Sequence, residues 1–270
     1  MLGKLMKHEF RATGRVMGPL YLALVLLALG ANGSVRLLSS ARNRFLTTMG
    51  GVELFVFALV IVAVCVMTLV IMIHRFRTNL LGDEGYVTFT LPASVHEQVW
   101  AKLIVSTVWA FATVAAICVA AMIAVFRVSY VNSFVESIRS MMQQMTSYYA
   151  LNGTAFLLEL LVLFIVACFC CCLEFYAAMS IGHSFANHKT LLSVVFFFLF
   201  QIVMQVIGTL SLFTTGNSGW LHDFFERMPN VSGVAAMHSL MGISILGTAI
   251  VTAIYYFLTT YMLKKHLNLE

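Results

Sequence analysis

Arg75 to Pro92 reads RFRTNLLGDEGYVTFTLP and interrupts a chain that is otherwise strongly apolar. The stretch holds two arginines, an adjacent Asp-Glu pair, two glycines and a proline, and long apolar runs lie on both sides of it. The glycines permit turns, and Pro92 ends any helix before it. Ser94 and Glu97 then have the spacing of a capping box, which starts a new helix. The sequence therefore predicts a folded polar elbow, Arg75 to Pro92, between two long helices.

The composition places those helices in a membrane. The chain has 270 residues, of which 61% are hydrophobic and only 10% are charged, and its mean hydropathy is +0.94. Soluble domains carry about 25% charged residues, so this chain cannot cover a surface that faces water. Crossing the hydrocarbon core takes roughly 20 apolar residues. We predict an all-α polytopic membrane protein, a single domain over residues 1–270, with six spans at Val16–Ala31, Val52–His74, Val99–Phe126, Gly153–Ile181, Thr190–Phe213 and Val234–Leu263.

The distribution of basic residues predicts the orientation. Ten of the 16 Lys and Arg residues lie on the side of the N-terminus, which favours both termini in the cytosol, although three arginines in the first outer loop run against this bias. No cleavable signal sequence is recognisable. All six cysteines fall in apolar runs, so no disulfide framework is expected. The net charge of +5 reflects these membrane flanks and does not indicate a nucleic-acid partner.

Three segments outside the spans have amphipathic patterns. Residues 1–15 predict a basic helix that lies along the inner leaflet, with a break or turn at Gly18-Pro19 before the first span. This helix is either a simple anchor or a contact for a partner. Residues 128–150 and 214–232 repeat apolar side chains at helical spacing and predict helices at the outer interface, the second of them between spans five and six.

The elbow has two interpretations. It is either a solvated turn whose acids keep it in water, or a surface that docks into another protein. Its leucines, Tyr86 and Phe89 are not needed in a solvated turn, and a simple helix connection requires only about 2–8 residues. Docking is therefore the preferred interpretation.

The elbow resembles the first intracellular loop of permease subunits of the ABC-2 exporter family, through NLLGDEGYVTFTLPAS at residues 79–94. AMSIGHSFANHKTLLS at residues 178–193 and YMLKKHLNLE at residues 261–270 resemble the same family. The resemblance covers the whole six-span layout, including the amphipathic start and the outer helix before the sixth span. No single motif is an enzymatic signature, and the specificity lies in the order of the motifs.

This resemblance implies a coupling helix in the elbow that presses on a separate cytosolic ATPase. The implied contact residues are Asn79, Leu80, Leu81, Gly82, Asp83, Glu84, Gly85 and Tyr86. Two ATPase copies, carrying ATP and Mg²⁺, and a second permease chain, identical or homologous, would complete a complex in a bacterial cell membrane. The implied cargo is a peptide antibiotic, a drug or a lipid-like compound.

Polar residues inside the predicted spans are candidates for a translocation pathway. Glu159 and Glu174 lie in the fourth span, 15 residues and about 22 Å apart, so they cannot share a proton or an ion. Gln201 and Gln205 share a face of the fifth span. Each of the four is either a structural hydrogen-bonding residue or part of the pathway.

The chain offers no catalytic or metal site of its own. It lacks the phosphate-binding loop G-x-x-x-x-G-K-[ST], and the cysteines of CFCCC, residues 168–172, are interpreted as apolar side chains. Besides a permease, we consider an ion-gradient-driven carrier that uses Glu159 or Glu174, and an integral membrane scaffold. The carrier is less favoured because its usual repeated Gly/Pro-interrupted helices are missing.

Overall fold

The computed structural model describes residues 2–40, 44–82, 85–86, 90, 93–124, 128–148, 153–185, 187–216 and 233–265. Within these ranges the chain is helical and has no strand. It divides into two compact units. The first contains residues 1–75 and 92–140, and the second contains residues 76–91 and 141–270.

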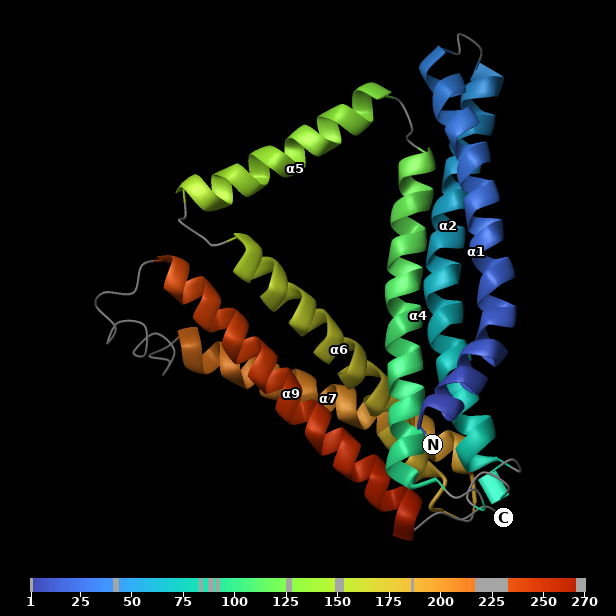
Figure 1. Ribbon diagram of the computed structural model, residues 1–270, viewed down its shortest axis with the longest axis vertical. Helices are drawn as coiled ribbons and strands as arrows, with labels where there is room; N and C mark the ends of the chain where they lie inside the picture. Colours follow the sequence, from blue (N-terminus) through green and yellow to red (C-terminus); the bar gives the residue numbers. More distant parts are fainter. Residues whose placement is uncertain are drawn as a thin grey trace. The chain divides into compact units, whose positions relative to one another are not determined.

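The first unit is built on α1 (Leu2–Ser40), α2 (Arg44–Phe76) and α4 (Val95–Ala124), which run alongside one another in Figure 1. Small residues allow α1 and α4 to approach closely. Ala28 and Ala31 of α1 and Ala120 and Ala124 of α4 are buried in one apolar cluster. Phe57 and Val64 of α2 belong to the same cluster.

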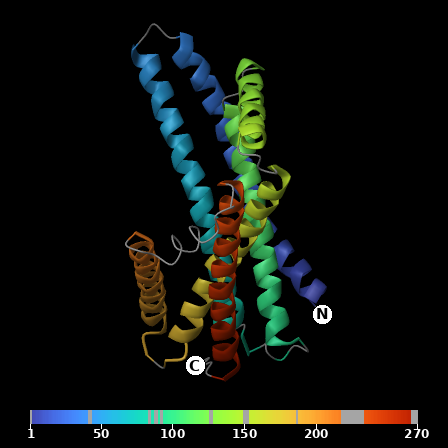
Figure 2. The same cartoon turned by 90° about the vertical axis from the view of Figure 1, so that its left-hand side faces the viewer.

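The second unit is built on α6 (Gly153–Gly182), α7 (Lys189–Gly216) and α9 (Gly233–Lys265). Helix α6 packs against both of the others, and Figure 2 shows this part from a second side. Phe175 stacks on Phe197, with ring centroids 4.6 Å apart, and Phe200 lies 5.2 Å from Tyr255. Aromatic rings from all three helices therefore meet between them. The boundary between the units falls in α5 (Val128–Tyr148), after Ser140.

Six of the described helices are long and apolar enough to cross a membrane, which makes the chain a multi-pass membrane protein. All six correspond to predicted spans, and the ends of α4, α6, α7 and α9 differ from the prediction by a few residues. Two helices are longer than predicted: α2 begins at Arg44, before Val52, and α1 runs from Leu2 to Ser40, beyond both ends of Val16–Ala31. The helix predicted over 128–150 is present as α5, whereas most of 214–232 lies outside the described residues.

The predicted break at Gly18-Pro19 is wrong. Helix α1 is continuous from Leu2 to Ser40 with Pro19 inside it. Proline removes one backbone hydrogen bond, to the carbonyl of Arg15, and usually kinks or ends a helix. Here the face that continues through the proline is buried on both sides of it, at Thr13, Met17 and Leu24, so packing against the rest of the first unit stabilises one uninterrupted helix.

The predicted capping box at the start of α4 is confirmed. The backbone N–H of Glu97 donates to Ser94 Oγ at 3.2 Å, and the backbone N–H of Ser94 donates to Glu97 Oε2 at 3.0 Å. Two otherwise unsatisfied donors are thus paired where the elbow ends and the third span begins.

Candidate functional site

The N-terminal part of α1 presents a polar face to α4. Glu9 and Thr13 are four residues apart, so they lie on one side of the helix, and both are buried. Lys4, Lys7 and Arg11 point elsewhere and are exposed. The acid is therefore separated from the bases around it in the sequence and is turned toward other helices.

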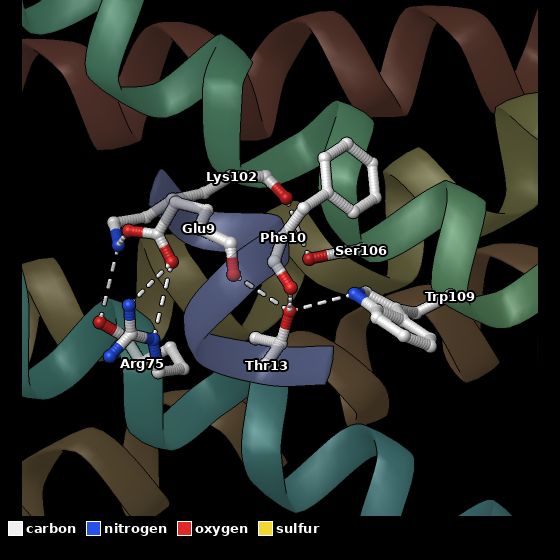
Figure 3. A network of polar contacts seen from close by, with 7 residues as sticks. All are labelled: Glu9, Phe10, Thr13, Arg75, Lys102, Ser106 and Trp109. Atoms are coloured by element: carbon white, nitrogen blue, oxygen red, sulfur yellow. Dashed lines mark hydrogen bonds and ion pairs between the residues drawn. The ribbon is translucent and has the colours of Figure 1, made fainter. Parts of the chain in front are cut away.

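Glu9 pairs with cations from two other helices. Figure 3 shows its carboxylate between Lys102 of α4 and Arg75 of α2. Lys102 Nζ donates to Oε1 at 2.7 Å, while Arg75 donates to Oε2 through Nη2 at 3.0 Å and Nε at 3.2 Å. Lys102 Nζ also donates to the backbone carbonyl of Arg75 at 3.3 Å. We call Glu9, Arg75 and Lys102 the charge triad; it joins one end of each of the three helices.

A neutral hydrogen bond continues this contact along α1 and α4. Trp109 Nε1 donates to Thr13 Oγ1 at 2.8 Å, and Thr13 Oγ1 donates to the carbonyl of Glu9 at 2.8 Å. The Phe10 ring lies 6.4 Å from that of Trp109. Further along, Tyr21 shares a 2.7 Å hydrogen bond with Thr113. The charge triad is thus the end of a longer row of polar contacts.

The elbow packs into the second unit immediately after the charge triad. Phe76 is fully buried and stacks on Tyr176 of α6, with centroids 3.8 Å apart and rings within 7° of parallel. A π-helical turn, η1 (Arg77–Leu81), follows. Arg77 Nη2 donates to Thr190 Oγ1 at 3.2 Å, which connects η1 to the start of α7.

The eight residues predicted to contact an ATPase divide into four groups. Leu80 and Leu81 are buried inside the second unit, so these side chains stabilise the fold. Tyr86 is 53% exposed and is available to a partner. Asp83 and Glu84 lie outside the described residues. Of the remaining three, Asn79 lies in η1, and the Gly85 N–H donates to the carbonyl of Gly82 at 2.8 Å. Their contact with an ATPase stays a prediction.

Glu159 and Glu174, the two acids of α6, have separate partners in the second unit. Glu159 of α6 faces His238 of α9, whose Nδ1 lies 2.8 Å from both carboxylate oxygens. Glu174 accepts a 2.8 Å hydrogen bond from Gln201 Nε2 of α7. Gln205 is exposed on α7. Each acid thus joins a pair of helices, and the pathway role of these four residues stays a prediction.

The junction of α6 and α7 is tightly packed. A Cβ built on Gly182 would lie 2.5 Å from the backbone nitrogen of Ser193 and 2.7 Å from its Cα. His183 is buried here, and its Nδ1 donates to the carbonyl of Met179 at 2.9 Å. Burial lowers the pKa of His183, and the charges of Arg77 and Lys189 lower it further, against the opposing effect of the bond to Met179.

Metal ligands do not gather in the described part of the chain. No group of three or more His, Cys, Asp or Glu side chains is placed there to hold an ion. Cys168, Cys170, Cys171 and Cys172 lie on α6 as thiols. Neither a model of a known protein family, nor a curated protein, nor a solved structure matches this chain.

The sequence analysis missed the charge triad. Arg75 and Lys102 were interpreted as charges that flank the spans, and Glu9 was given no role. One signal was present: Glu9 is the only acid among the first 50 residues, which contain many bases. An acid in such a segment needs a specific partner when it is buried, but the partners lie 66 and 93 residues away.

Proposed function

We propose that this chain is the membrane-spanning permease subunit of an ATP-driven exporter, working with a separate cytosolic ATPase. The observation that supports this proposal is the position of the elbow. Phe76, Leu80 and Leu81 are buried, with Phe76 stacked on Tyr176 of α6, yet Tyr86 is exposed. A protein that pressed on the exposed part would therefore move a segment that is packed firmly onto membrane helices.

The packing of η1 makes the elbow suitable for transmitting force. The stack of Phe76 on Tyr176 fixes the elbow to α6, and Leu80 and Leu81 of η1 are buried. The bond from Arg77 to Thr190 extends the connection to α7. ATP-driven movement of the partner would bias the permease between inward-open and outward-open states. The resemblance to ABC-2 permeases supports the same role, with two ATPases and a second permease chain, and favours a peptide antibiotic, drug or lipid-like cargo.

Purification under mild conditions tests the partner. The tagged chain, extracted from its native membrane, should bring with it an ATPase that contains a phosphate-binding loop. Recovery of an active transporter without any such ATPase would contradict the proposal. The complex would then be reconstituted in liposomes to measure ATP hydrolysis and cargo movement together.

Charge reversal in the elbow tests the contact. The double variant Asp83→Lys and Glu84→Lys should reduce substrate-stimulated ATP hydrolysis by roughly tenfold, because close charge pairs at interfaces contribute more than about 1.4 kcal/mol. Glu136→Lys is the matched control, since Glu136 is an exposed acid on α5. Unaltered stimulated hydrolysis in the double variant would exclude the elbow as the contact.

The pair of Glu159 and His238 favours one alternative, a carrier driven by an ion gradient. Two titratable groups in contact between spans are a feature of proton pathways. Such a carrier would move its cargo in liposomes that contain this chain alone and an imposed proton gradient. The permease proposal predicts no movement under those conditions.

A further inference from the structure

Helix α2 is held to the rest of the first unit in a different way from α1 and α4. Those two helices approach closely through small residues, and Asn32 Nδ2 of α1 donates to the carbonyl of Ile123 in α4 at 2.9 Å. Side chains of α2 make several of its contacts, and the backbone carbonyl of Arg75 adds one by accepting from Lys102 Nζ at 3.3 Å. The side-chain contacts include Phe57 and Val64 in the apolar cluster and a 3.1 Å hydrogen bond between Thr68 and Thr113. At its C-terminal end α2 is held by Arg75.

At that end the carboxylate of Glu9 lies between two cations. Lys102 and Arg75 are both cations, and each binds a different oxygen of Glu9. Lys102 and Glu9 are largely buried, with side chains 7% and 11% exposed. Without the charge of Glu9, the ammonium of Lys102 and the guanidinium of Arg75 would repel each other in a poorly hydrated place. Glu9 therefore replaces this repulsion with an attraction to both cations, and the bond from Lys102 Nζ to the carbonyl of Arg75 adds to it.

The part of the elbow that belongs to the second unit begins one residue after this contact. Arg75 is the last residue of its segment in the first unit, and Phe76 is the first residue of the elbow that belongs to the second. Phe76 is fully buried against Tyr176. Displacing the end of α2 must therefore displace the stacked ring or bend the backbone between the two residues.

We infer that Glu9 is a positioning residue for coupling: by binding Arg75 and Lys102 together, it fixes the point from which the elbow transmits movement to the membrane helices. The inference rests on the proposed function. Glu9 itself does not touch cargo or nucleotide. It keeps the start of the elbow stationary, so that pressure on the exposed part moves α6 and α7 and is not dissipated by movement of α2.

The first test measures coupling in the reconstituted complex. Glu9→Gln keeps the shape of the side chain and removes its charge. We expect ATP hydrolysis to continue, while the amount of cargo moved per ATP falls roughly tenfold. Glu136→Gln is the matched control and should leave that ratio unchanged. A ratio equal to wild type in Glu9→Gln would overturn the inference, because a purely structural loss would lower both rates together.

A second variant keeps the inference testable if Glu9→Gln folds poorly. Arg75→Gln leaves Glu9 and Lys102 as a neutral pair and releases only α2. It should lower the ratio of cargo to ATP by a similar factor, whereas Arg15→Gln, at an exposed base of α1, should not. An unchanged ratio in folded Arg75→Gln would equally overturn the inference.

A third measurement does not need an ATPase. Amide hydrogen exchange in residues 68–76 should be faster in Glu9→Gln and in Arg75→Gln than in their controls, since the end of α2 is no longer held. Unchanged exchange in both variants would contradict the role of Glu9. If the wild-type chain proves to have no ATPase partner, the proposed function fails, and this measurement still decides whether Glu9 positions α2.

Discussion

The two units of this chain use different chemistry to hold their helices together. In the first, polar contacts follow α1 and α4 from the charge triad through Thr13 and Trp109 to Asn32. In the second, aromatic rings join α6 to α7 and α7 to α9. Two acids of α6 add a contact each, Glu174 with Gln201 of α7 and Glu159 with His238 of α9. In the most apolar 18-residue stretch of each of the first three spans, 17–33% of the residues are buried within the chain, against 6% in the corresponding stretch of each of the last three.

This difference shows how helices find one another where water is scarce. Lipid is as apolar as leucine, so apolar burial alone gives membrane helices little preference for each other. Close packing and hydrogen bonds supply that preference in the first unit. The second unit leaves more of its surface to lipid or to other chains. In α7 every residue from Gln201 to Leu210 is exposed.

Replacing Lys102 should have the largest effect of the changes considered. Lys102→Met leaves the buried Glu9 with half of its compensation, which costs about 3 kcal/mol. The exposed Lys7, changed to Met, is the control and should cost much less. Denaturation in mixed SDS micelles measures both. Equal stability of the two variants would contradict the claim that the charge triad stabilises the first unit.

Gly182→Ala tests whether the stability of the second unit also depends strongly on a single contact, as that of the first unit depends on Lys102. The added methyl group would meet the backbone of Ser193, so α6 and α7 must separate, at a cost of about 2 kcal/mol. The control is Gly208→Ala in α7, which has open space and should be neutral or slightly stabilising. The same denaturation measurement applies. Equal stability of the two alanine variants would show that α6 and α7 can separate at this junction at little cost.

Trp109→Phe isolates a neutral hydrogen bond in the first unit. The ring is largely preserved, but Thr13 Oγ1 loses its donor, and stability should fall by about 1 kcal/mol. Trp100→Phe, on the same helix and 40% exposed, is the control. A loss of stability no greater than that of Trp100→Phe would mean that the polar contacts between α1 and α4 orient the helices but stabilise them little.

The Glu159–His238 pair should contribute less. Hydrogen bonds between membrane helices average about 0.6 kcal/mol, and both side chains are about a quarter exposed. A double-mutant cycle with Glu159→Gln and His238→Gln measures the coupling energy directly. A coupling energy as large as the cost of Lys102→Met would remove the contrast between the units.

The smallest effect should be the dependence on pH that His183 confers. Its pKa is lowered in the folded chain from 6.5, so the unfolded chain binds the proton first as the pH falls. The stabilisation is complete above 6.5 and is lost as the pH falls through the folded pKa. His183→Gln should flatten this part of the profile, and the exposed His8, changed to Gln, should not. Thermal unfolding between pH 5 and 8 checks both.

The spans were predictable because each is a long apolar segment, a signal that does not depend on the rest of the fold. The capping box at Ser94 and Glu97 was predictable for a similar reason, since its two members are close in the sequence. Pro19 was misjudged, because local propensity favours a break and only packing beyond the segment opposes it. Sequence spacing carries no information of that kind.

The candidate site was harder to predict for two physical reasons. A carboxylate such as Glu9 can pair with any cation that the fold brings near it, and its partners here come from two distant spans. The apolar residues of the elbow were attributed to a docking surface, whereas the fold buries Leu80 and Leu81. A sequence indicates that a side chain must leave water, but it does not say whether its own chain or another one will cover it.

The charge triad also constrains the order in which this protein can be made. Its members lie far apart in the chain, so Glu9 leaves the ribosome long before Lys102 does. Until the third span has been synthesised, the lone carboxylate and Arg75 must remain hydrated or be shielded by the insertion machinery. The first unit can therefore close only when α4 arrives, and a nascent chain that stops before that point would be exposed to membrane proteases.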